Sequence, residues 1–204
     1  MRFDKTVLLA TLIALSATLT APLAAQVRAP ETFGIDPGQT PVLEISLGYT
    51  YLHANAPPAQ CGCFSANGGY GSAVLGLPRG FSVVADLAGV HAKNIANSNQ
   101  TITVFNYLFG PRYSMRKVSR RFVPYVQALG GSSQEMSNYA FVQNVSGPAF
   151  SVGGGVTTTI TANHHFGWTI VEADWVGSRL PNAQNNVQND LRISTGLIFR
   201  LGPR

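Results

Sequence analysis

The C-terminal stretch of the chain decides the fold. It reads Trp168-Thr-Ile-Val-Glu-Ala-Asp-Trp-Val176 and, after a polar loop, Asp190-Leu-Arg-Ile-Ser-Thr-Gly-Leu-Ile-Phe-Arg-Leu201. Both halves alternate between apolar and polar residues, and successive side chains of a strand point to opposite sides. One face is therefore continuously apolar, and the other holds two acids and two arginines. Such strands suit a wall between hydrocarbon and a wet, ion-paired interior, which is the wall of a transmembrane β-barrel.

The alternation also predicts which side chains face lipid. In the first half we expect the lipid-facing set to be Thr169, Val171, Ala173 and Trp175. In the second half the corresponding set is Leu191, Ile193, Thr195, Leu197, Phe199 and Leu201. The intervening residues, among them Glu172 and Asp174, are expected inside the barrel.

The composition agrees with a protein that faces something other than water. The chain has 204 residues, of which 45% are hydrophobic and only 11% are charged, against roughly 25% charged in soluble domains. The only long apolar run, residues 7–25, follows Arg2 and Lys5 and ends in Leu-Ala-Ala-Gln. This arrangement predicts a cleavable secretory signal over residues 1–25. No later segment approaches about 18 consecutive apolar residues, so a helical membrane protein is excluded.

The basic balance of the chain does not indicate nucleic-acid binding. The sequence pI is near 9.5, but an exported chain does not meet nucleic acid. The basic residues are dispersed except at Arg116, Lys117, Arg120 and Arg121, which are typical of a solvated turn.

An all-β, eight-stranded, antiparallel up-and-down barrel is expected over residues 41–204, after an extended lead-in at 26–40. The expected strands are 43–52, 70–77, 81–90, 101–114, 122–132, 149–161, 168–176 and 190–201. The longer polar connections begin at His53, Ala92, Ser133 and Gly177, and we expect them on the outer side. Pro111 predicts a bulge or the membrane-exit end of its strand. The facing of residues 122–132 stays open, because Val123, Tyr125, Gln127 and Leu129 compete with Val126 and Ala128.

Four segments resemble the small OmpA-like outer-membrane β-barrel family of Gram-negative bacteria. They are Tyr107-Leu-Phe-Gly-Pro-Arg-Tyr113, Phe122-Val-Pro-Tyr-Val-Gln-Ala-Leu-Gly-Gly131, Val171-Glu-Ala-Asp-Trp175 and Arg192-Ile-Ser-Thr-Gly-Leu-Ile-Phe-Arg-Leu-Gly202. The resemblance implies an outer-membrane location and no shared catalytic residues. It also implies contact with outer-membrane lipid and lipopolysaccharide, and recognition by the barrel-assembly machinery through the last strand, where Phe199 is the anchor. The chain departs from the family pattern at its tail, Pro203-Arg204, and no peptidoglycan-binding domain follows.

Seven charged residues fall on the inward faces and form the candidate site. They are Glu44, Asp86, Arg112, Glu172, Asp174, Arg192 and Arg200. An eight-stranded barrel is just wide enough for side chains to fill it, so we predict a buried ion-pair network. Glu44 should meet Arg200, and Asp174 should meet Arg192. A gated ion path is the alternative, but structural pairing is favoured because removing one partner would strand a buried charge.

Other reactive residues form no constellation. Cys61 and Cys63 indicate a loop disulfide or two free thiols rather than a metal site, since only His53 is near them. No histidine pairs with a serine in a catalytic pattern, so a lipid-modifying enzyme is the least favoured function and no cofactor is expected. A soluble calycin-like binder would have its apolar face inward, contrary to the pattern.

The function that the sequence favours is a structural or surface-interaction role in the bacterial envelope. A porin-like passive channel for small solutes is the alternative. We expect a monomer whose polar outer loops offer the places for an extracellular ligand.

Overall fold

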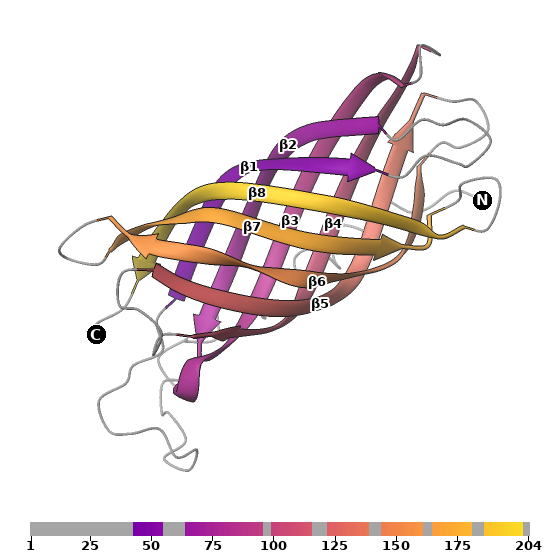
Figure 1. The fold of residues 1–204 in the computed structure, drawn as a ribbon. Coiled ribbons are helices and arrows are strands. Elements are labelled where there is room, and N and C mark those ends of the chain that lie inside the picture. Colours follow the sequence, from indigo (N-terminus) through magenta and orange to yellow (C-terminus); the bar gives the residue numbers. More distant parts are fainter. Residues whose placement is uncertain are drawn as a thin grey trace, which may run out of the picture. The chain divides into compact units, whose positions relative to one another are not determined.

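The computed structural model describes residues 43–54, 64–95, 99–115, 122–138, 144–160, 165–180 and 186–201. Eight strands lie in these ranges: β1 (Leu43–Ala54), β2 (Phe64–Gly76), β3 (Phe81–Ile95), β4 (Gln100–Ser114), β5 (Phe122–Ser137), β6 (Val145–Thr159), β7 (Phe166–Ser178) and β8 (Gln188–Leu201). Each strand pairs antiparallel with its neighbours in the chain, and β8 pairs with β1, so the sheet closes into a barrel (Figure 1). The predicted fold is confirmed.

One end of the barrel, the terminal end, holds the start of β1 and the end of β8. The opposite end is the loop end. Gly80, with φ of +87°, lies in a short turn of the terminal end, the 3-10 turn η3 (Pro78–Gly80) between β2 and β3. No helix in the described part of the chain is long and apolar enough to cross a membrane.

Several strands are longer than the sequence predicts, mostly toward the loop end. β2 begins at Phe64 rather than at residue 70, and the expected loop starts His53, Ala92, Ser133 and Gly177 all lie within strands. The reason is chemical. At the loop end the outward side chains become polar, as at His53 and His91, so the hydrophobic contrast fades while the backbone ladder continues.

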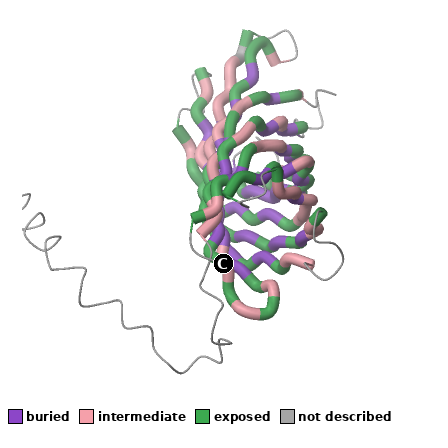
Figure 2. Tube along the Cα trace, turned by 90° about the vertical axis from the view of Figure 1, so that its left-hand side faces the viewer, coloured by how far each residue is buried: buried purple, intermediate pink, exposed green. Residues whose placement is uncertain are grey.

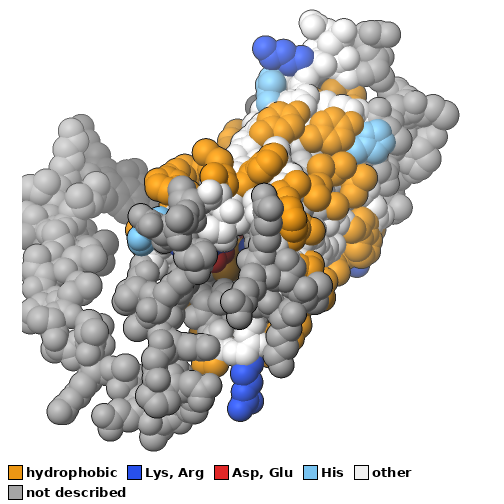
Figure 3. Space-filling view, turned by 60° about the vertical axis from the view of Figure 1, so that its left-hand side comes forward, with side chains coloured by type: hydrophobic (Ala, Val, Ile, Leu, Met, Phe, Trp, Pro, Cys, Tyr) orange, Lys and Arg blue, Asp and Glu red, His pale blue; other side chains and the backbone are white. Residues whose placement is uncertain are grey.

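Burial alternates along most of the length of the strands (Figure 2). The outward face forms an apolar belt, on which Figure 3 shows hydrophobic side chains gathered. The belt includes Leu47, Leu75, Leu87, Phe109, Val152, Val171 and Leu197. Aromatic pairs stand near its borders, with Phe81 against Tyr113 at the terminal end and Phe150 against Trp175 nearer the loop end. Hydrocarbon-facing barrels carry this kind of belt and girdle.

The apolar core lies inside the barrel and consists of two clusters. One cluster fills the loop-end half beneath β1 to β4 and consists of Leu52, Ala54, Ala66, Val90, Ala92 and Val104. A second cluster consists of Val74, Val84, Leu108, Leu129 and Ala149.

The structure settles the facing of β5. Tyr125, Gln127 and Leu129 are buried inside, whereas Val126 is 49% exposed on the outer face. Because residues 122–132 are apolar on both faces, their sequence does not show which face points inward. The closed barrel decides it.

A β-bulge in β7 overturns one predicted facing. Thr157 and Val156 of β6 pair with Thr169 and Val171, which leaves Ile170 as an extra residue. The register against β8 shifts at the same place. Side-chain parity therefore reverses: Thr169 is 3% exposed and faces inward, while Trp168 is 43% exposed and faces outward. The expectation that Thr169 faces lipid was wrong, because strict alternation cannot include an extra residue.

At Pro111, where the sequence predicts either a bulge or the membrane-exit end of the strand, the structure shows no bulge, and the strand is close to its end. Pro111 pairs with Val83 without a register shift, and β4 ends three residues later at Ser114. The irregularity between β3 and β4 lies instead between Lys93 and Ile95, around Asn94 with φ of +53°. The signal segment 1–25, the lead-in 26–40, Cys61, Cys63 and the basic turn at 116–121 lie outside the described residues.

Candidate functional site

The candidate site is a cluster of charged side chains in the middle of the lumen. Arg192 lies at its centre on β8, where strand parity turns it inward. Its Nη2 is 2.7 Å from Asp174 Oδ2 and its Nη1 is 2.6 Å from Asp86 Oδ1. A third carboxylate, Glu172, has Oε1 3.6 Å from Arg192 Nη2. One guanidinium thus contacts carboxylates from β3 and β7, on different sides of the barrel.

Arg112 on β4 forms the second centre of the cluster. Its Nη2 donates to Gln127 Oε1 at 2.6 Å and lies 3.3 Å from Glu172 Oε2. Its Cζ stands 4.0 Å from the ring centroid of Tyr125, within the range of a cation–π interaction. The guanidinium is thus held by a carboxylate, an amide and an aromatic ring.

Neutral side chains link the two centres. The amide of Gln127 donates to Asp174 Oδ1 at 3.1 Å, and the hydroxyl of Tyr125 donates to Glu172. The cluster has three carboxylates, those of Asp86, Glu172 and Asp174, against two guanidinium groups. Gln127 serves the Asp174 oxygen that Arg192 does not contact, and Tyr125 adds a donor to the Glu172 oxygen that Arg112 contacts. Hydrogen bonds and ion pairs of this kind make a buried polar network tolerable.

A separate ion pair stands at the terminal end. Glu44 and Arg200 are register partners on β1 and β8, and Arg200 Nε lies 2.9 Å from Glu44 Oε1. Arg200 Nη1 also donates to Thr159 Oγ1 at 3.2 Å. This pair joins β8 to β1 and β6, and the described contacts do not connect it to the central cluster.

All seven predicted charged residues point into the barrel, and five of them meet in the central cluster. The sequence reasoning missed Tyr125 and Gln127, because the facing of β5 was open. It also missed the buried acids Glu135 and Asp190 near the loop end. Asp190 lies two residues before Arg192 in β8, so the two side chains share the inward face. The alternation of the sequence could therefore have predicted that Asp190 is buried.

Glycines opposite two buried tyrosines explain how the rings fit in the lumen. A Cβ on Gly48 would lie 2.7 Å from Tyr70 Cε1 and 2.2 Å from the Thr195 carbonyl oxygen. A Cβ on Gly155 would lie 2.7 Å from the Tyr125 hydroxyl. The rings of Tyr70 and Tyr125 therefore occupy space that any other residue at these glycines would take.

The described residues contain no group of three or more His, Cys, Asp or Glu side chains that could hold a metal ion. The described histidines lie on exposed surface. His91 Nδ1 is 2.8 Å from Thr103 Oγ1, and His165 Nδ1 is 3.3 Å from the Arg200 carbonyl oxygen. The chemistry that the central cluster can perform is electrostatic: it holds strands together and occupies the lumen.

No protein-family model and no curated protein matches the sequence. Solved structures do match it. Ail, the attachment invasion locus protein of Yersinia pestis, aligns with a TM-score of 0.55 at 12% identity, over 80% of this chain and 100% of Ail. Neisserial surface protein A gives 0.58 at 12% identity, over 78% of this chain and 97% of that one. AlkL gives 0.50 at 10% identity, over 86% and 98% respectively.

The fold is that of the small outer-membrane β-barrels. At these identities the likeness concerns the fold alone, and at that level the resemblance to OmpA-like barrels is confirmed. The closed sheet leaves no open edge, as a bilayer requires. Together with the apolar belt, this fold places the protein in the bacterial outer membrane.

Proposed function

We propose that this protein is an envelope structural or surface-interaction barrel whose lumen is closed by its own side chains. The observation that carries the proposal is the contact of Arg192 with Asp86 and Asp174 across the middle of the lumen. These groups are buried, and each side chain is held by at least one partner. A barrel of eight strands has little room beside such a cluster. Solute passage would require the cluster to separate.

The surface role follows from the closed lumen, because a barrel that does not pass solutes can still bind a partner through its outer connections. Its outer connections meet the surroundings of the cell, and loops on a rigid scaffold are the usual place for binding. Among proteins of this fold, Ail is an attachment invasion locus protein that has been crystallised with the heparin analogue sucrose octasulfate. This supports the class of function proposed here, and the ligand of this chain stays to be identified.

Partners in the membrane follow from the same proposal. The outward belt would contact phospholipid and lipopolysaccharide, and the barrel-assembly machinery would recognise the last strand. Phe199 is suited to this recognition because its side chain faces outward and packs edge-on against Phe166, with ring centroids 5.2 Å apart. The protein would act as a monomer without a cofactor.

Conductance in planar bilayers tests the closed lumen. Purified wild-type protein should give no steady current, whereas Arg192→Ala should give flickering openings because the central contacts are lost. Lys93→Ala, on the exposed side of β3, is the matched control and should stay silent. Large steady currents in the wild type that persist after residues 55–63 and 181–185 are shortened would make the protein a passive channel instead.

A loop exchange tests the surface role. Replacing residues 55–63 and 181–185 with short Gly-Ser connections should leave the barrel folded and reproduce the surface phenotype of the full deletion. If the loop-exchanged protein restored every envelope property of the deletion strain, the surface role would be wrong.

A further inference from the structure

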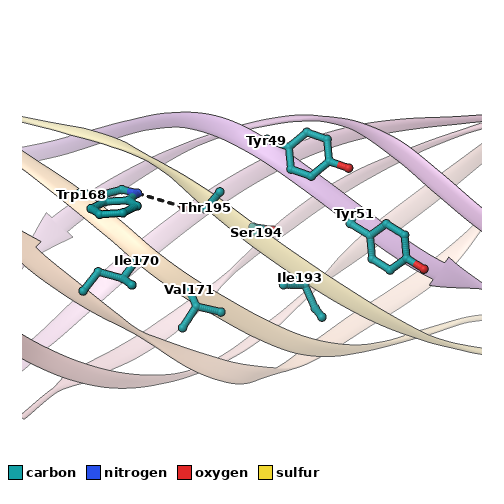
Figure 4. Close-up of a pocket in the computed structure, with 8 residues that line it drawn as sticks. All are labelled: Tyr49, Tyr51, Trp168, Ile170, Val171, Ile193, Ser194 and Thr195. Atoms are coloured by element: carbon teal, nitrogen blue, oxygen red, sulfur yellow. Dashed lines mark hydrogen bonds between the residues drawn. The ribbon is translucent and has the colours of Figure 1, made fainter.

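A groove of about 530 Å³ opens on the outer wall of the barrel, where β7, β8 and β1 run side by side (Figure 4). Its lining includes Tyr49 and Tyr51 from β1, Trp168 and Val171 from β7, and Ile193 and Thr195 from β8. These six side chains lie on the lipid-facing side of the wall, within the apolar belt. The volume is in the range of small-molecule sites.

The bulge at Ile170 creates this groove. Because of the extra residue, Trp168 and Val171 both face outward, although three positions separate them. A regular strand would turn one of the two inward. The indole of Trp168 and the side chain of Val171 therefore border the same hollow, with Thr195 and Ile193 beside them on β8.

Every polar side-chain group of the lining already has a partner within the protein. Trp168 Nε1 donates to Thr195 Oγ1 at 2.9 Å, and Thr195 Oγ1 donates to the Thr169 carbonyl oxygen at 2.9 Å. The hydroxyls of Tyr49 and Tyr51 bond to Asn67 and Ser65. Ser194, the remaining polar residue of the lining, has Oγ 2.9 Å from Thr50 Oγ1.

This satisfaction determines which chemistry the groove can accept. A phosphate or a charged headgroup would be held best by a cation or by free donors, but the lining holds no charged residue and its polar groups are already hydrogen-bonded within the protein. A bare hydrocarbon chain needs none of these. A hydrocarbon chain in the groove gains dispersion contacts with the lining side chains. If the groove stayed empty, the lining atoms would lack these contacts.

We propose that the groove is a defined binding site for one acyl chain of a membrane phospholipid. The chain lies between the aromatic side chains of β1 and Trp168 of β7, over Ile193 and Thr195. In this groove the chain would contact side chains of three strands, β1, β7 and β8. The site is independent of whether the lumen conducts.

The two tryptophans of the chain provide a matched pair of reporters. Trp168 lines the groove, whereas Trp175 is equally outward, at 48% exposure against 43%, but lies outside the lining. Trp175→Phe and Trp168→Phe each leave a single fluorophore. The probe is a phosphatidylcholine with bromine at mid-chain, titrated into the folded barrel in detergent micelles. Folding is checked by heat-modifiable migration on gels.

Quenching of Trp168 should saturate near one lipid per barrel, at a mole fraction where Trp175 is barely quenched. Quenching of Trp175 should grow in proportion to the lipid mole fraction. Filling the groove by Ile193→Phe, or independently by Val171→Phe, should remove the saturable phase. Leu87→Phe, on the belt at β3, should leave it unchanged.

Three outcomes would overturn the proposal. The first is equal, unsaturable quenching of both tryptophans. The second is a saturable phase that survives both groove-filling variants in folded protein. The third is saturation by brominated lipid A but not by the phospholipid, which would assign the groove to a different lipid.

Discussion

Asp86 and Arg192 meet inside the barrel although 106 positions separate them in the chain, with Arg192 Nη1 2.6 Å from Asp86 Oδ1. Asp86 is on β3 and Arg192 on β8, and these strands are not neighbours in the sheet. The contact therefore crosses the lumen. Both side chains are almost fully buried, at 3% and 1% exposure. Two strands that share no backbone hydrogen bond are thus joined by charge.

Replacing Arg192 with methionine should lower the free energy of unfolding by about 3–5 kcal/mol, because buried carboxylates lose their main cation. Urea unfolding from lipid vesicles, followed by tryptophan fluorescence, measures the loss. Lys93→Met, at an exposed position, should change stability by about 0.5 kcal/mol or less. Adding Asp86→Asn to Arg192→Met should recover part of the loss, since one fewer charge is stranded. Equal losses for Arg192→Met and Lys93→Met would contradict this account of the cluster.

Gly48→Ala should destabilise the barrel, because its new Cβ would lie 2.2 Å from the Thr195 carbonyl oxygen and 2.7 Å from Tyr70 Cε1. Overpacking of this kind typically costs about 1–3 kcal/mol. Gly130→Ala is the matched control in β5, because nothing lies within 4 Å of the position its Cβ would take. Urea unfolding from lipid vesicles measures both variants. A Gly48→Ala variant as stable as Gly130→Ala would contradict the prediction.

Leu197→Arg should cost about 2–4 kcal/mol of folding free energy, because Leu197 faces hydrocarbon near the middle of β8. Leu201→Arg, on the same face at the terminal end of the strand, should cost about 0–1 kcal/mol, since the side chain can reach the interface. Leu197 and Leu201 are nearly equally exposed, at 52% and 53%, so depth is the variable that differs. If both variants lost equal stability, the belt would not follow the depth of the bilayer.

Deleting Ile170 should destabilise the protein more than Ile170→Ala does. The deletion removes the bulge, so that residues 166–169 turn over and Trp168 is driven toward the filled lumen. The expected additional loss is about 1–3 kcal/mol, the usual scale for overpacking. Ile170→Ala keeps the residue count and the parity, and so controls for loss of the side chain. A deletion variant as stable as the alanine variant would show that the bulge has no role in placing Trp168.

The sequence by itself determined the architecture of this protein. The period-two alternation in 168–176 and 190–201 identified lipid-facing and lumen-facing sets, and the same rhythm along the chain predicted eight strands and closure. It also placed Glu44, Asp86, Arg112, Glu172, Asp174, Arg192 and Arg200 on inward faces. These inferences succeed because side-chain parity is a local property of an extended backbone.

Only the tertiary structure decided register, the bulge and the contacts across the lumen. Parity says that Asp86 and Arg192 point inward, but their meeting depends on how strands β8, β1, β2 and β3 are staggered around the closed barrel. Thr169 was misplaced for a related reason: one extra residue at Ile170 reverses parity, and it leaves no mark in the amino-acid pattern. The facing of Tyr125 and Gln127 was fixed by closure, because β5 is apolar enough on both faces to satisfy either assignment locally.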